Sequence, residues 1–190
     1  YMPNFKTSSI RILAASSFVF GSLMAVQAPA FAGAGHSGGH GRETVSDIGA
    51  PGKISDVRRT VRITMEDNFY DPEKIIVRGG ETVRFLVENK GEFVHEFNIG
   101  TAAMHAGHQE EMMMMVEHGV LDVDKIHMDK MEMDMGNGMT MKHDDPNSVL
   151  LEPGKTAEVT STFPKKAELE FACNVPGHYE SGMVGKVRLQ

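Results

Sequence analysis

The loop Cys173-Asn-Val-Pro-Gly-His178-Tyr-Glu-Ser-Gly-Met183 carries a thiol, an imidazole and a thioether at C-x4-H-x4-M spacing, just before the alternating segment 184–189. A loop that leads into a C-terminal strand can present these three side chains to one ion. Two imidazoles, one thiolate and a distant Met form the trigonal site that proteins use for one-electron copper chemistry. The second imidazole must come from elsewhere, and His95, in the alternating segment 93–99, is the obvious donor.

Core packing, zinc binding and catalysis compete with copper binding as roles for these residues. A lone Cys is usually a buried small hydrophobe, and a lone Met is usually a core filler. Zinc is the strongest competing metal, but a structural zinc site takes four strong ligands, and Met is a poor one. A catalytic Cys–His pair is the weaker alternative, because no third residue orients it and Met183 has no role in it. The four donors taken together favour copper.

These motifs resemble the cupredoxins of the plastocyanin/azurin type. The stretch from Cys173 to His178 is similar to the azurin ligand loop, and Gly182-Met-Val-Gly-Lys-Val187 is similar to the end of plastocyanin. Gly80-Glu-Thr-Val-Arg-Phe85 resembles the family's approach to its first His ligand. The resemblance covers residues 58–100 and 149–190.

The resemblance implies one type 1 copper ion, held by His95, Cys173, His178 and Met183. Glu96 and Asn174 each follow a ligand, and we expect them to support the site from behind. Pro176 has no backbone N–H to offer the sulfur, and Gly177 allows a tight turn before His178. The chain departs from the family at two positions: Val94 replaces the Gly of azurin before the first His, and Ala172 replaces an aromatic residue before Cys173. Electrons would therefore leave through His178.

Hydrophobic alternation predicts strands in most of the remaining domain. Period-two patterns occur around residues 61–65, 83–87, 93–99, 156–163 and 184–189, with turn signals such as Asp71-Pro72 and Pro153-Gly154 between the strands. About seven or eight short strands predict an all-β, Greek-key β-sandwich. We expect its core to contain Phe85, Val87, Phe93, Phe97, Ile99, Phe163, Leu169 and Phe171.

The segment 101–148 interrupts this pattern, and its composition is unusual. From Met104 to His143 it holds eleven of the fifteen Met and five of the nine His. We predict a partly helical or disordered insert, with a helix over 109–126 that is weakened at Gly119. The insert is similar to that of periplasmic cupredoxins associated with copper resistance.

Some of these Met residues are expected to pack on the sandwich. The segment is too charged to bury all of them, and soft thioethers favour Cu(I), while imidazoles also accept Cu(II). The candidates for additional copper are Met104, His105, His108, Met112, Met113, Met114, Met115, His118, His127, Met128, Met131, Met133, Met135, Met139, Met141 and His143.

The N-terminal residues indicate export. Residues 1–32 have the pattern of a signal peptide, with Lys6 and Arg11, an apolar run over 12–26 and Ala30-Phe-Ala32 as a cleavage site. The apolar run is too short for a stable membrane span. Residues 33–57 are Gly-rich and are predicted to form a flexible arm, in which His36 and His40 are further candidates for copper. Residues 58–190 form the cupredoxin domain.

The overall charge and the single Cys narrow the function. The net charge is −7, and no basic patch interleaved with aromatic residues indicates nucleic acid. One Cys cannot form an intramolecular disulfide, and copper would protect its thiolate in an oxidising compartment.

We therefore predict a monomeric periplasmic type 1 copper protein involved in copper tolerance, whose partner is a redox or copper-handling protein. A dedicated electron shuttle is the alternative. A cuprous oxidase is less favoured, because the chain has too few His for an oxygen-reducing centre.

Overall fold

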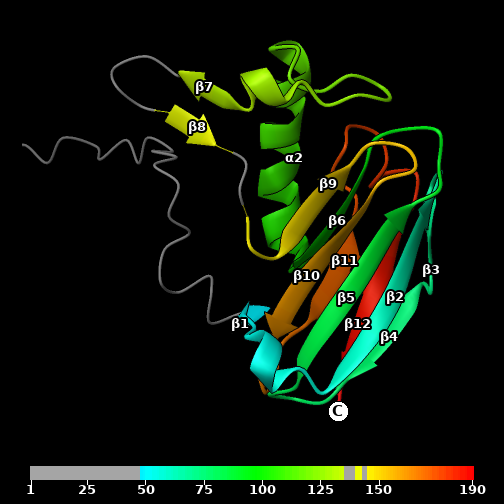
Figure 1. The fold of residues 1–190 in the computed structure, drawn as a ribbon, viewed down its shortest axis with the longest axis vertical. Helices are drawn as coiled ribbons and strands as arrows, with labels where there is room; N and C mark the ends of the chain where they lie inside the picture. The colour runs from blue at the N-terminus through cyan, green and yellow to red at the C-terminus, as the bar shows by residue number, and fades with distance from the viewer. Residues whose placement is uncertain (1–47, 135–139, 143–144) are drawn as a thin grey trace, which may run out of the picture. The chain divides into compact units, whose positions relative to one another are not determined.

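The computed structural model of the chain describes residues 48–134, 140–142 and 145–190 (Figure 1). The predicted signal peptide lies outside these residues, as do the copper candidates His36, His40, Met135, Met139 and His143, and the side chains of Met133 and Met141. Within the described parts of the chain, no helix is long and apolar enough to span a membrane.

Residues 48–57, the end of the predicted flexible arm, belong to the folded domain. Ile48 is buried in the core, and burial of such an apolar side chain stabilises the fold. Strand β1 (Ala50–Pro51) pairs with strand β10 (Thr156–Thr162), and the short 3-10 helix η1 (Ile54–Asp56) follows. The domain therefore begins earlier than the predicted boundary at residue 58.

The first sheet has five strands in the order β1-β10-β5-β2-β3. Strand β5 pairs parallel with β2 and antiparallel with β10. Along β5, Val83, Phe85 and Val87 are buried, so one face of the sheet meets the core. In this sheet, β5 spans Thr82–Asn89, β2 spans Arg59–Glu66 and β3 spans Phe69–Asp71.

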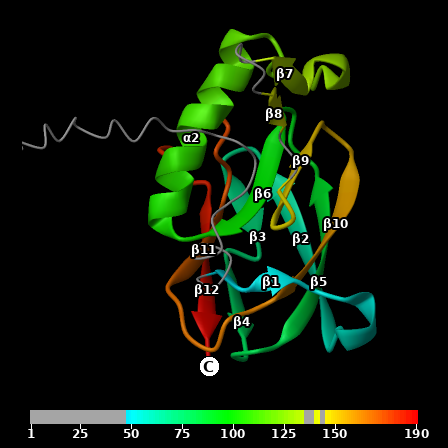
Figure 2. The ribbon, with the colours of Figure 1, turned by 90° about the vertical axis from the view of Figure 1, so that its left-hand side faces the viewer.

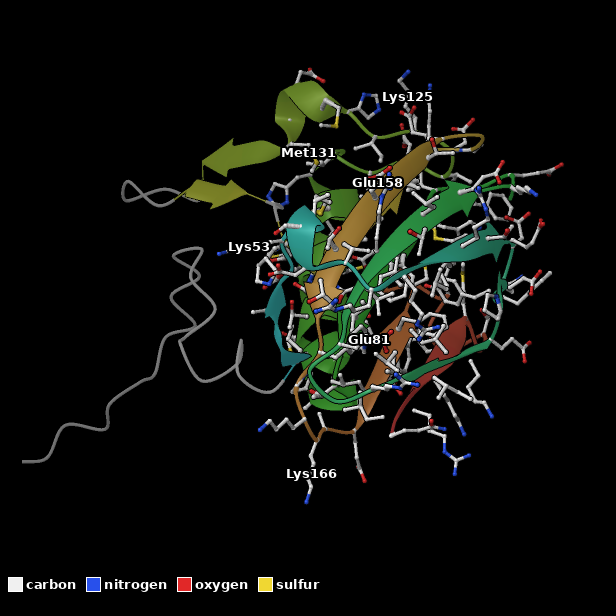
Figure 3. The ribbon with its side chains drawn as sticks, turned by 60° about the horizontal axis from the view of Figure 1, so that its bottom comes forward. Lys53, Glu81, Lys125, Met131, Glu158 and Lys166 are labelled. Carbon is white, nitrogen blue, oxygen red and sulfur yellow. The ribbon has the colours of Figure 1, made fainter. Side chains whose placement is uncertain are left out.

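The opposite face of this sheet carries an ion pair between Glu158 and Arg84, across β10 and β5. At the start of β2, Arg59 donates one hydrogen bond to Glu81 at 2.8 Å and another to the carbonyl of Ile76 in the second sheet. Both acids are labelled in Figure 3. Both arginine side chains are at least a third exposed, so each pair adds little stability. The face that carries Arg84 and Glu158 is the solvent side of the sheet.

The second sheet has the order β4-β12-β11-β6-β9. Strand β4 runs parallel to β12, and the other neighbours are antiparallel. Strand β6 is buried at every position, because the core covers one of its faces and a helix lies along the other (Figure 2). These strands are β4 (Lys74–Val77), β12 (Val184–Leu189), β11 (Leu169–Ala172), β6 (His95–Gly100) and β9 (Ser148–Leu151).

The core lies between the two sheets, where aromatic rings from both meet. The ring centroids of Phe85 and Phe97 are 5.4 Å apart, and those of Phe97 and Phe171 are also 5.4 Å apart. This packing confirms the predicted β-sandwich. Phe93 was wrongly predicted to join the core: it is 38% exposed, because it lies in the bend before β6. Its ring is instead 6.4 Å from that of His178.

Helix α2 (Ala102–Glu117) follows β6 directly. The side chain of Thr101 caps it by accepting a hydrogen bond from the N–H of Met104 at 3.2 Å. Shortly after the helix ends, Gly119 has a φ of +65°, a conformation that favours Gly and stops helices. The prediction of a helix over 109–126 was therefore wrong at both ends. The helix begins directly after the cap at Thr101 and ends at Glu117, shortly before Gly119.

The insert builds a small core of its own against the sandwich. Val94, which precedes β6, is fully buried in it, and its N–H donates to the carbonyl of Val123 at 2.8 Å. The insert is therefore anchored on the residue next to His95. The cluster consists of Val94, Met112, Met115, Val120, Leu121 and Ile126.

The rest of the insert returns the chain to the sandwich. The 3-10 helix η2 (Met128–Lys130) leads to a two-stranded sheet of β7 (Glu132–Asp134) and β8 (Thr140–Lys142), and β9 then pairs with β6. The insert thus leaves and rejoins the sheet at two neighbouring strands.

Candidate metal centre

Two neighbouring strands bring two of the predicted ligands to one end of the sandwich. His95 is the first residue of β6, and Cys173 directly follows the last residue of β11. Because these strands are antiparallel neighbours, the start of one lies beside the end of the other. The N–H of Glu96 accordingly donates to Sγ of Cys173 at 3.3 Å.

The loop after Cys173 adds an imidazole and a thioether at the same place. The N–H of Met183 donates to the carbonyl of His178 at 3.0 Å, and its own carbonyl accepts from the N–H of Cys173 at 3.2 Å. The side chain of Met183 is fully buried. Gly177 has a φ of +86°, which allows the turn before His178, and Pro176 has no N–H to offer in this loop.

Three donor atoms form a compact triangle. Nδ1 of His95 and Nδ1 of His178 are 3.2 Å apart, and Sγ of Cys173 lies 3.9 Å from the first and 3.3 Å from the second. A point equidistant from all three is about 2 Å from each, close to the bond lengths of imidazole and thiolate to a first-row metal. Among the described His, Cys and acidic residues, this is the one group of three that could hold an ion.

The protonation states suit a metal. Burial lowers the pKa of His95 and His178, so both rings are neutral and have a lone pair at neutral pH. Burial raises the pKa of the Cys173 thiol to about 12, although the N–H groups of Glu96 and Val175 oppose the shift. A metal ion that binds here must displace this proton, which makes its affinity depend on pH.

Asp67 is a supporting residue of the site that was not predicted from the sequence. Its Oδ1 accepts a hydrogen bond from Nε2 of His95 at 2.8 Å, which directs Nδ1 toward the other donors. Burial would raise the pKa of Asp67, but hydrogen bonds from His95 and the N–H of Glu92 lower it. Gly91 is required for this pair, because a Cβ there would lie 2.3 Å from Oδ1. An acid in a tight turn before Asn68 is too common a signal to indicate a site.

The two predicted supporting residues bind each other. The buried carboxylate of Glu96 accepts from the N–H of Asn174 at 3.2 Å and from its Nδ2 at 2.8 Å. It also accepts from the hydroxyl of Ser148 at 2.6 Å, and the Glu96 carbonyl accepts from the hydroxyl of Tyr70 at 2.6 Å. Glu96 therefore ties the loop after Cys173 to both sheets.

The candidates for additional copper in the insert divide into a buried and an exposed group. Nε2 of His108 lies 2.9 Å from a carboxylate oxygen of Glu96, and Nδ1 lies 3.0 Å from one of Glu111. Both ring nitrogens of His108 are thus engaged with carboxylates, and the structure gives no support to the prediction that His108 binds copper. The buried candidates are His105, His108, Met112 and Met115.

Thioethers of the exposed group can meet copper in solution. Met113 is 47% exposed and Met128 is 69% exposed, whereas Met104, Met114 and Met131 are half-buried. Nδ1 of His118 lies 2.8 Å from the carbonyl of Met114, and Nε2 of His127 lies 2.9 Å from a carboxylate oxygen of Asp122. Copper binding by this group stays a prediction.

A β-sandwich that gathers two imidazoles, a buried thiol and a neighbouring Met at one end defines a copper protein of the cupredoxin class. Residues 57–190 match the plastocyanin/azurin family of copper-binding proteins, and the chain belongs to that family. Copper is therefore the cofactor that fits the donor set.

The relatives that match this chain over most of its length share one name. The chain is 45% identical over 186 residues to the copper-resistant cuproprotein CopI of Pseudomonas aeruginosa, covering 95% of this chain and 97% of that protein. It is 37% identical over 182 residues to CopI of Rubrivivax gelatinosus, with 93% and 96% covered. For CopI of Vibrio cholerae the identity is 31% over 156 residues, with 81% and 79% covered.

Solved structures support the fold. Auracyanin B matches with a TM-score of 0.53 and 17% identity, over 76% of this chain and 99% of that one. The reduced auracyanin of Roseiflexus castenholzii matches with a TM-score of 0.50 and 21% identity, over 70% and 98%. At such low identity, these matches speak for the fold alone.

Proposed function

We propose that this protein is a periplasmic type 1 copper protein that helps the cell to tolerate copper. In this proposal His95, Cys173 and His178 would be the strong ligands, and Met183 would be a weaker donor. The observation that carries the proposal is the convergence of two Nδ1 atoms and one Sγ atom around a single point. The relatives named copper-resistant cuproproteins support tolerance as the role.

The N-terminal sequence supports a periplasmic location. Basic residues, an apolar run and an A-x-A site follow one another within residues 1–32, the order that directs secretion. A lone thiol in an oxidising compartment is vulnerable to oxidation. Cys173 is fully buried, and metal ligation would protect it further.

The surrounding residues would fix the geometry of the site. Bound copper supplies one-electron chemistry, while Asp67 orients His95 and the β6–β11 pairing places Cys173 beside it. Because paired strands hold these donors, they need little rearrangement between oxidation states. His178 is the most exposed of the three strong donors, and its ring lies beside the exposed ring of Phe93. Electrons would leave through this edge.

We assign the exposed thioethers of the insert a second part in tolerance. Thioethers are soft donors that select Cu(I), and Met113 and Met128 are exposed to it. These side chains would bind Cu(I) in addition to the ion in the sandwich. The buried Met112 and Met115 are packing residues and are excluded from this role.

A growth experiment tests the role in tolerance. In a strain that lacks this gene, the wild-type protein is expected to restore growth on copper, whereas Cys173→Ser is expected to fail. A Met113→Ala, Met128→Ala double variant should restore growth in part, because the core site remains. Full protection by Cys173→Ser would rule out the sandwich site as the basis of tolerance.

A dedicated electron shuttle is the second candidate. It is favoured by the exposed Phe93, whose ring lies 6.4 Å from that of His178 and could lie against a redox partner. A shuttle would be needed in the absence of copper stress. A growth defect without added copper, corrected by the wild type but not by Cys173→Ser, would favour this alternative.

A further inference from the structure

Two histidines of helix α2, one turn apart, contact residues beside the proposed copper ligands. Nε2 of His108 lies 2.9 Å from Oε1 of Glu96, and Nδ1 of His105 lies 3.2 Å from Nδ2 of Asn174. Glu96 and Asn174 each directly follow a proposed copper ligand in the sequence. The insert therefore contacts the site at β6 and at the loop that follows β11.

His108 is a buried cation. Both of its ring nitrogens face carboxylate oxygens, those of Glu96 and Glu111, and an imidazole can donate from both nitrogens only when it is protonated. Burial alone would lower the pKa of His108, but the two carboxylates outweigh this effect and raise the pKa to about 10. The side chain of His108 is 8% exposed, so its charge is largely shielded from solvent.

Glu96 is the buried acceptor that faces this cation. Its side chain is fully buried, and a buried carboxylate is costly unless it is paired and hydrogen-bonded. The amide groups of Asn174 and the hydroxyl of Ser148 supply neutral donors, and His108 supplies the opposite charge. Removal of one partner from such a pair leaves an uncompensated charge in the protein interior.

The same Glu96 touches the copper site through its backbone as well. Its N–H donates to Sγ of Cys173 at 3.3 Å, while its carboxylate holds both amide groups of Asn174. Whatever fixes the side chain of Glu96 therefore also fixes the start of the loop that carries Cys173 and His178.

We propose that His108 is a positioning residue of the copper site: its contact with the carboxylate of Glu96 fixes that side chain, so that Glu96 can hold Asn174 and the ligand loop. Helix α2 of the insert then helps to hold the ligand loop of the site in place. The inference deepens the proposed function and depends on the proposed copper ligands only where a reduction potential is measured.

Hydrogen exchange provides the first test. The full-length protein is compared as wild type, His108→Gln and Arg84→Gln, with and without copper, and exchange is followed over residues 173–183. Arg84→Gln is the matched control, because it also removes a cation from a Glu pair, but on the solvent face of the other sheet. We expect exchange in the loop to rise several-fold in His108→Gln and to stay at the wild-type level in Arg84→Gln.

The conservative variant His108→Lys makes this test specific. It keeps a cation opposite Glu96 and should restore slow exchange at least in part. In the copper-free protein, the reaction of Cys173 with a disulfide reagent should accelerate in His108→Gln and return toward the wild-type rate in His108→Lys. A lower melting temperature in His108→Gln, with unchanged loop exchange and thiol reactivity, would show that His108 only packs and would overturn the proposal.

Reduction potentials provide the second test. The loss of a positive charge in His108→Gln should stabilise Cu(II) and lower the potential, and the loss of a negative charge in Glu96→Gln should raise it. The double variant should lie between the two. Shifts in both single variants that are no larger than that of Arg84→Gln would contradict the proposal. The hydrogen-exchange result stands even if the copper ligands prove to be different.

Discussion

Two regions of this chain look like copper sites in the sequence, but their metal-binding side chains are arranged differently in the structure. In the C-terminal loop, Cys173, His178 and Met183 are spaced for one ion, and the fold brings two of these donors together with His95. In the insert, His and Met are abundant but have no such spacing. Part of them is buried there as structural residues, and part is exposed. Spacing on one loop therefore indicates a site better than composition does.

The two regions are also connected. The insert packs on Val94, His108 pairs with Glu96, and His105 contacts Asn174. All three sandwich residues are sequence neighbours of a proposed ligand. The Met/His-rich segment thus packs against residues beside the proposed ligands, and among its described thioethers Met113 and Met128 are exposed.

The strongest effect should occur at the core site. Cys173→Ser should abolish the visible absorption of the copper-loaded protein, because that absorption arises from the copper–thiolate bond. Cu(I) bound by the insert should remain. Absorption spectra and metal counts on the same samples measure both. A variant that keeps its visible band would place the chromophore elsewhere.

The next prediction separates buried from exposed thioethers in one helix. Met112→Ala should lower the free energy of unfolding by about 2–5 kcal/mol, because it leaves a cavity in the core of the insert. Met113→Ala should change it by no more than about 0.5 kcal/mol but should reduce the Cu(I) bound. Urea unfolding and Cu(I) titration of both variants provide the comparison. Equal losses of stability would mean that the two positions are not distinct.

A smaller effect is expected at Met183. Met183→Leu should retain the visible band and raise the reduction potential, because a weak donor to Cu(II) is lost while the three strong donors remain. Potentiometry with parallel metal analysis measures this. Loss of all copper from the variant would make Met183 a primary ligand.

The weakest expected effect is a change in how the unfolding free energy depends on pH, caused by His108 in the insert. The pKa of His108 is raised to about 10 from an ordinary value of 6.5, so its stabilising contribution is complete below about pH 6.5 and is lost as the pH rises toward 10. The unfolding free energy of the copper-free wild type should therefore decline between pH 7 and pH 10 more steeply than that of His108→Gln. The remaining titrating groups are common to both proteins. Parallel curves would deny His108 its raised pKa.

The sequence predicts the sandwich and its ligand loop well, because alternation marks the buried face of strands such as β5 and one loop carries several ligands. It does not predict Asp67, since contact with His95 depends on how two turns meet and on the space at Gly91. Nor does it predict the burial of His108. The burial of that side chain depends on the limits of α2, which place His108 opposite Glu96.

X-ray absorption at the copper edge, on the protein loaded with one equivalent of Cu(II), decides whether the sandwich holds the first copper ion. We predict a first shell of two imidazole nitrogens and one short thiolate sulfur, supplied by His95, His178 and Cys173. A shell of nitrogen and oxygen alone, or of several long thioether sulfurs, would show that the first copper binds outside the sandwich and would contradict the proposed site.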